Sequence, residues 1–185
     1  MKRLGVIVAA LVALGAPLAY ATTVGDRDDV ATAFDIAKVS GAHNRATDQL
    51  VHTIDFYAAI PHRVAKSGAP DSVCIEIWTR STPGESQPDY EACATRAKGS
   101  SWKGSIARKR ERGPQLRLGA VKVEQPSDTR LVIRIDPDDI KRPAGYRWRT
   151  EATSFGTECK ISSGCPDYAP DRPGTAETKL SKPRA

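Results

Sequence analysis

The chain's three histidines are the first residues to test for catalysis, because histidine is the usual acid–base group near neutral pH. His52 falls on the apolar face of a predicted strand, which indicates a packed histidine with one satisfied ring nitrogen. Asp55 points to the opposite face by strand parity, so the two cannot form a dyad within that strand. His43 and His62 lie in loop-like stretches with no identifiable partner in the sequence.

Motifs for covalent or cofactor chemistry are missing from the sequence. No zinc-protease, nucleophile-elbow, P-loop or dinucleotide motif occurs. The segment 100–103 (Ser-Ser-Trp-Lys) matches the S-x-x-K spacing of penicillin-recognising enzymes. In those enzymes the S-x-x-K motif opens a helix, whereas segment 100–103 leads into a predicted strand. The other motifs of those enzymes are absent from this sequence. We therefore expect no catalytic residue and no enzyme activity, with a small secreted hydrolase as an alternative.

Two groups of acids carry oxygen ligands of the kind that calcium takes, about six to eight at a time. Asp26, Asp28 and Asp29 lie near the start of the chain, and Glu85 and Asp89 lie in a predicted hairpin loop. Neither group completes a calcium-loop motif. We favour solvated surface acids and expect no cofactor, with calcium as the candidate ion.

Residues 96–117 form a basic segment that contains a single acid, Glu111. A hairpin with this charge could hold a polyanion. Lysine and arginine also occur at hairpin tips and sheet edges, where they block aggregation. The segment carries Arg96, Lys98, Lys103, Arg108, Lys109, Arg110, Arg112 and Arg117, and the candidate polyanion-binding residues are Lys103, Arg108, Lys109, Arg110 and Arg112.

The tryptophans divide between core and surface. Tyr146 and Trp148 share an apolar strand face and are expected in the core. Trp78 falls on the face opposite Ile75 and Ile77, where an outward indole is a candidate platform for stacking a sugar. Packing of Trp78 beside a disulfide or under a loop is the favoured alternative.

The residues considered so far lie in or between short runs in which apolar and polar residues alternate with a period of two. Separated by Gly, Pro, Ser and Asp, these runs predict an all-β, jelly-roll-like antiparallel β-sandwich of about eight strands. The apolar phase shifts near Gly119, which predicts a bulge. Asp136 and Pro137 predict a helical turn over 136–140. The clearest strands are 50–56, 73–80, 130–135 and 146–152, and weaker ones are expected at 33–39, 88–97, 101–108 and 116–124.

The four cysteines favour disulfides, because their number is even and the chain carries an export signal. In a hairpin of 73–80 with 87–95, placing Cys74 opposite Cys93 puts the apolar side chains together on the other face. The same register opposes Glu76 and Glu91, which is unfavourable unless a cation intervenes. Zinc is not expected, since no C-x-x-C pair occurs. The remaining pair, Cys159 and Cys165, then closes a short loop.

The two ends of the chain predict export and a tail. Residues 1–21 read as a signal peptide with a basic start, an apolar run of about 11 residues and an Ala-x-Ala cleavage site near Ala21. That run is shorter than a membrane span of about 20 residues. We expect a secreted β-sandwich over 22–172, with no membrane span, and a disordered tail over 173–185. Removing Lys2 and Arg3 lowers the formal charge from +6 to +4.

The chain resembles exported bacterial β-sandwich proteins of largely unknown function, which are similar in strand layout to carbohydrate-binding jelly-roll modules. Relatives of this kind carry an acid-rich turn between the two central strands, whereas residues 80–86 here retain only Glu85. The marks of the resemblance are Gly25-Asp26, Phe34-Asp35-Ile36, Leu50 to Ile54, Ile75-Glu76-Ile77, Pro88 to Glu91, Tyr146-Arg147-Trp148, Thr153-Ser154-Phe155, Cys159, Cys165 and Ala169-Pro170-Asp171.

The resemblance implies a non-catalytic exported domain that binds a glycan or a cell-surface partner. The basic segment 96–117 supports an alternative, a surface protein that binds a polyanion. The salt dependence of binding separates the two, because polyanion binding weakens steeply with salt and sugar stacking does not.

Overall fold

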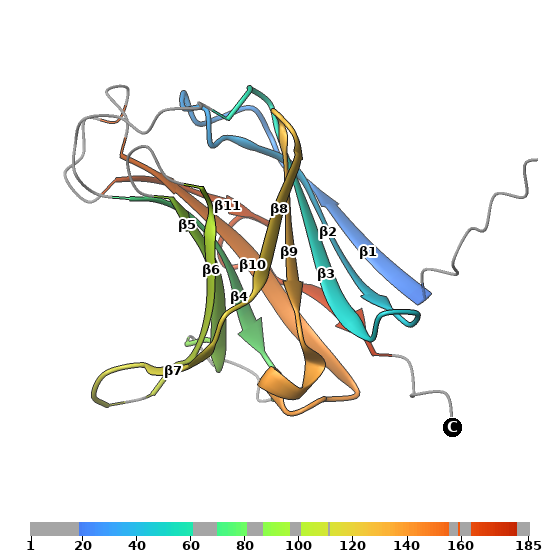
Figure 1. Cartoon of the computed structure of the whole chain (residues 1–185). Coiled ribbons are helices and arrows are strands. Elements are labelled where there is room, and N and C mark those ends of the chain that lie inside the picture. The colour runs from blue at the N-terminus through green and yellow to red at the C-terminus, as the bar shows by residue number, and fades with distance from the viewer. Residues whose placement is uncertain are drawn as a thin grey trace, which may run out of the picture.

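The computed structural model describes residues 19–60, 70–80, 87–96, 101–110, 112–155, 159 and 164–180. These residues form twelve strands in two antiparallel sheets packed together (Figure 1), which confirms the β-sandwich and corrects the expected number of about eight. The strands are β1 (Ala19–Gly25), β2 (Ile36–Asn44), β3 (Gln49–Phe56), β4 (Asp71–Trp78), β5 (Tyr90–Arg96), β6 (Lys103–Arg108), β7 (Leu116–Gly119), β8 (Lys122–Ser127), β9 (Arg130–Ile135), β10 (Gly145–Ser154), β11 (Cys165–Ala169) and β12 (Ala176–Lys179).

The first sheet has the order β1-β2-β3-β9-β8, and the second has the order β11-β10-β4-β5-β6-β7, with β12 also paired to β10. Strict alternation makes β3 and β5 bury every second residue. Ile54 and Ile133 from the first sheet join Ile75, Ile77 and Trp148 from the second in one buried core. The sandwich forms because each sheet has one apolar face to bury.

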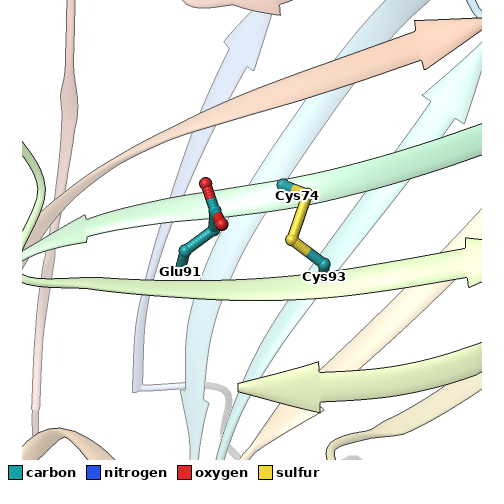
Figure 2. A group of neighbouring side chains, drawn as sticks. All are labelled: Cys74, Glu91 and Cys93. Atoms are coloured by element: carbon teal, nitrogen blue, oxygen red, sulfur yellow. A yellow bond between two sulfur atoms is a disulfide. The ribbon is translucent and has the colours of Figure 1, made fainter. Parts of the chain in front are cut away.

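The β4–β5 hairpin has the register expected from the sequence. Cys74 lies opposite Cys93 and is bonded to it, on the outer face of the sheet (Figure 2). Glu76 lies opposite Glu91, and each carboxylate meets a cation: Arg149 reaches Glu76, and the Lys109 ammonium lies 2.8 Å from Glu91. These cations offset the repulsion that the register would otherwise create.

The second disulfide joins Cys159 to Cys165 at the start of β11, again as expected. Both bridges are therefore confirmed, and no cysteine remains free to ligate zinc.

The segment predicted as one strand over 116–124 is two strands that belong to different sheets. β7 pairs with β6 and carries a register irregularity beside Gly119, where a bulge was expected, and β8 pairs with β9. The chain crosses between the sheets at Ala120 and Val121. A Cβ on Gly104 would lie 2.0 Å from the Val121 carbonyl oxygen, so β6 needs glycine at this crossing.

The helical turn forms as the sequence indicates, as a 3-10 helix over Pro137–Ile140. The Asp136 side chain accepts a hydrogen bond from the Asp138 backbone N–H at 2.9 Å, which caps the turn.

Strand β12 corrects the expectation that residues 173–185 are a disordered tail. Ala176 and Thr178 are buried, and the Trp148 indole N–H donates to the Thr178 hydroxyl at 2.9 Å. The strand escapes sequence analysis because its inward residues are small and its outward residues, Glu177 and Lys179, are charged. The domain therefore extends at least to Leu180, which donates its backbone N–H to the Ala144 carbonyl.

Strand β1 is an edge strand that spans the predicted cleavage point near Ala21. Thr22 to Gly25 pair continuously with β2, and the register shifts between Ala19 and Thr22. Residues 1–18 lie outside the described part of the chain, so the signal peptide stays a prediction. Among the described residues, none belongs to a helix that has the length and apolarity to cross a membrane.

His52 is a packed core histidine, as its place in the sequence predicts. It is fully buried, its Nε2 lies 2.9 Å from the Tyr146 hydroxyl, and its Nδ1 has no hydrogen-bond partner. Burial lowers the pKa of His52 to about 3. The ring is therefore neutral in the folded protein over most of the pH range.

We predict that Thr178→Val lowers the free energy of unfolding by about 1–3 kcal/mol, because the buried Trp148 N–H loses its acceptor. Urea denaturation measures the change. Lys179→Val, on the exposed face of the same strand, should change the stability by less than about 0.5 kcal/mol. Equal effects of the two substitutions would show that β12 does not dock on Trp148.

We predict that His52→Gln makes folding less sensitive to acid. The unfolded chain protonates this histidine near pH 6.5, whereas the folded chain does so only near 3, so stability falls as the pH drops through this window. Between pH 6.5 and 4.5 the wild type should lose about 2–3 kcal/mol more than the variant. Urea denaturation at both pH values provides the test, and parallel losses would argue against the assignment.

Candidate functional site

Trp78 is on the outer face of β4, as strand parity predicts, but its side chain is only 3% exposed. The Arg149 guanidinium lies 5.5 Å from the Trp78 ring and 5.3 Å from the Tyr168 ring. Arg172 covers Tyr168 from 4.0 Å. Stacking of a sugar on Trp78 stays a prediction, and it would require Arg149 to move.

The same arginine neutralises Glu76. The Arg149 Nε lies 2.8 Å from the Glu76 carboxylate, the Nη2 also contacts it, and both residues are more than nine-tenths buried. Arg149 thus joins β10 to β4 by an ion pair and to β11 by a ring contact. This arrangement holds the outer face of the second sheet together.

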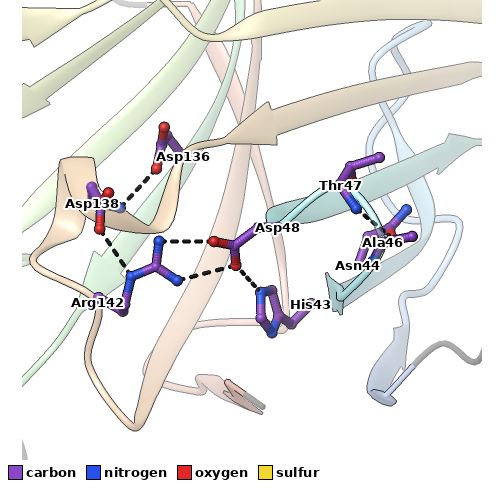
Figure 3. A network of polar contacts seen from close by, with 8 residues as sticks. All are labelled: His43, Asn44, Ala46, Thr47, Asp48, Asp136, Asp138 and Arg142. Carbon is purple, nitrogen blue, oxygen red and sulfur yellow. Dashed lines mark hydrogen bonds and ion pairs between the residues drawn. The ribbon is translucent and has the colours of Figure 1, made fainter. Parts of the chain in front are cut away.

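His43 has a partner that the sequence did not reveal. The tight turn after β2 brings Asp48 back, so that its carboxylate lies 2.9 Å from His43 Nε2. Figure 3 shows Arg142 bonded to both Asp48 and Asp138. Arg142, followed by His43, holds the pKa of Asp48 below its usual range. His43 is 2% exposed, so this network joins a hairpin to the β10 approach and offers no reactive imidazole to solvent.

Of the other residues tested for catalysis, only some lie in the described part of the chain. Lys103 is the first residue of β6, so the S-x-x-K segment leads into a strand, as expected. Ser100 lies outside the described residues. His62 also lies outside them.

The acids selected from the sequence separate into two places. Asp89 is held by Thr79 and Arg80, and Glu85 lies outside the described residues. Asp26 and Asp28 lie in the β1–β2 connection together with Asp29. There they meet Asp35 and Asp167, two buried acids that sequence analysis did not select.

We call residues 103–119 the basic finger. It consists of β6 and β7, which pair at the edge of the second sheet, and the connection between them, which extends beyond the strand ends in Figure 1. Gly113 has a φ of +85° in this connection, a conformation that glycine adopts without strain. Lys109 anchors the base of the finger through its ion pair with Glu91.

The basic residues of segment 96–117 have different environments. Arg96 is 5% exposed, lies 3.6 Å from Asp71 and covers the Trp102 ring, so it is a structural cation. Lys98 lies outside the described residues. Five side chains of the finger are exposed, and within the described ranges they make no ion pair or side-chain hydrogen bond: Lys103, Arg108, Arg110, Arg112 and Arg117.

Among the described residues, two hollows offer space for a ligand. A groove of about 360 Å³ lies over β6 and is lined by Lys103 and Arg117 of the finger. A second pocket, of about 520 Å³, lies at the end of β4 and is lined in part by Trp78, Arg147 and Glu177.

Comparisons with protein-family models, curated proteins and solved structures found no match to this chain. The chemistry of its own side chains is therefore what bears on its function.

We predict that Arg149→Met destabilises the fold by about 3 kcal/mol, because it leaves Glu76 buried without a cation and opposite Glu91. Urea denaturation provides the measurement. The matched control is Arg147→Met, on the same face of β10 but more exposed, with an expected change below about 1 kcal/mol. Adding Glu76→Gln to Arg149→Met should recover part of the loss. No difference between the two single variants would contradict the role assigned to Arg149.

Proposed function

We propose that this protein is an exported, non-catalytic β-sandwich domain that binds a polyanion through the basic finger. The observation that supports it is the set of five exposed lysine and arginine side chains on the finger that have no acidic partner among the described residues. Polyanions bind such groups largely by releasing condensed counterions.

The contrast with three paired cations on the first sheet favours this function. Lys38 and Arg130 both pair with Asp55, and Lys122 pairs with Glu124. Pairing of this kind cancels most of the field that a surface charge projects into solvent. Among the described residues, the five exposed cations of the finger have no such acidic partner, so their positive potential is available to a ligand.

The groove over β6 offers a concave surface beside these cations. Lys103 and Arg117 line it, together with Ser105 on β6 and Gln115 before β7. Hydroxyl and amide groups beside two cations suit an anionic group that accepts hydrogen bonds, such as a sulfate or phosphate ester.

A glycan is the second candidate ligand, because the 520 Å³ pocket is lined by Trp78, Arg147 and Glu177. Its volume falls within the range of small-molecule sites, and its charged side chains could bind sugar hydroxyls. The low exposure of Trp78 weighs against stacking, so we rank this function second.

We predict that the protein binds heparin, a sulfated polysaccharide, and that binding weakens steeply with salt. The triple variant Arg108→Gln/Arg110→Gln/Arg112→Gln should bind at least tenfold more weakly at low salt. The slope of log K against log salt should fall by about one for each arginine that no longer pairs with a sulfate group. Fluorescence titration of labelled heparin over a series of salt concentrations measures both quantities.

The matched control removes the same charge elsewhere, as Arg45→Gln/Lys141→Gln/Lys179→Gln, and should retain wild-type affinity within about twofold. Equal weakening by the two triple variants would show that net charge, and not the finger, drives binding. Binding of a neutral oligosaccharide without salt dependence, abolished by Arg147→Ala, would favour the glycan function instead.

A further inference from the structure

A cluster of aspartates forms where the β1–β2 connection meets β11. One carboxylate oxygen from each of Asp29, Asp35 and Asp167 lies within 4.8 Å of the other two. The charge of Asp28 acts on Asp35, and the charge of Asp26 acts on Asp167. Residues separated by more than 130 positions in the chain thus bring several negative charges to one place.

The cluster contains a buried carboxylate oxygen that lacks a hydrogen-bond partner. Asp35 is 2% exposed, and its Oδ1 is buried with no hydrogen-bond partner. Asp167 is 4% exposed. An ionised carboxylate without a partner is costly to bury, so an unpartnered oxygen inside an acidic cluster points to a missing positive group.

Hydrogen bonds hold the ligands in place without using all of their capacity. Asp167 accepts one backbone N–H on each oxygen, from Ile36 at 2.6 Å and from Tyr168 at 2.8 Å. The Tyr57 hydroxyl donates to the Asp26 carbonyl at 2.7 Å, and the Tyr57 backbone N–H donates to the Asp35 carbonyl. Each carboxylate oxygen of Asp167 keeps a lone pair for a further ligand.

The described part of the chain places no compensating side-chain cation at this cluster. In the described ranges of the chain, no lysine or arginine forms an ion pair with Asp29, Asp35 or Asp167. Burial and the neighbouring acids raise the pKa of Asp35 to about 6, and burial, followed by the charges of Asp26 and Asp35, raises the pKa of Asp167 to about 7.

We propose that Asp29, Asp35 and Asp167 bind a calcium ion that ties the β1–β2 connection of one sheet to β11 of the other. The three ligands are hard carboxylate oxygens without histidine or thiolate, the donor set that calcium prefers. Two oxygens that bind one calcium ion lie at most about 4.6–5.2 Å apart, and all three oxygens here lie within 4.8 Å of one another. Asp26 and Asp28 can complete the shell directly or through water. This inference is independent of the basic finger.

Calorimetric titration of the oxidised protein with calcium chloride should give one strong site per chain. At calcium a hundredfold above the dissociation constant, the melting temperature should rise by about 5–10 °C. Asp35→Asn should weaken calcium binding at least tenfold. In EDTA the same variant should melt at or above the wild-type temperature, because the amide removes a repulsion and keeps the shape.

Asp29→Asn, at an exposed ligand, provides a second variant if Asp35→Asn does not fold, and it should weaken calcium binding similarly. Asp139→Asn makes the same change in the acidic group beside Asp136 and Asp138, and it should retain the full calcium response. The proposal fails if calcium does not stabilise the wild type, if magnesium stabilises it equally, or if the Asp35 and Asp29 variants respond to calcium as the wild type does.

Discussion

The alignment of β4 against β5 is the constraint on which the rest of the second sheet depends. Cys74 faces Cys93, and this register sends Ile75 and Ile77 into the core while Glu76 and Trp78 face outward. A slip of one residue would exchange the two faces, because strand side chains alternate with period two. Because the register places Glu76 and Trp78 on the outer face, Arg149 can pair with Glu76 and cover the Trp78 ring there.

This arrangement separates two kinds of cation. Arg149, Lys109 and Arg96 lie over the central strands, where each meets an acid fixed by the register. The four arginines of the basic finger, by contrast, pair with no acid among the described residues. The basic segment looks uniform in sequence, but the structure divides it into paired cations and exposed cations. The exposed cations are those that we propose bind a polyanion.

The extent to which sequence predicts this molecule follows from the range of the interactions involved. Strong alternation in 50–56 and 130–135, and the pairing of Cys74 with Cys93, are local patterns, and they located strands and a register correctly. β12 was not predicted, because its buried residues Ala176 and Thr178 are too small and polar to indicate a buried strand face. Their burial follows only from the position of Trp148 opposite them. The crossing from one sheet to the other near Gly119 shifts the apolar alternation of the sequence in the same way as a bulge. The two strands were therefore predicted as one.

The acidic cluster shows the same limit, because Asp35 and Asp167 are 132 positions apart and no local motif connects them. The most direct test of the account is peptide mapping of the unreduced protein, since the disulfides report the register on which the faces depend. We expect peptides that join Cys74 to Cys93 and Cys159 to Cys165. A peptide joining Cys74 to Cys159, or Cys93 to Cys165, would contradict the register and the faces derived from it.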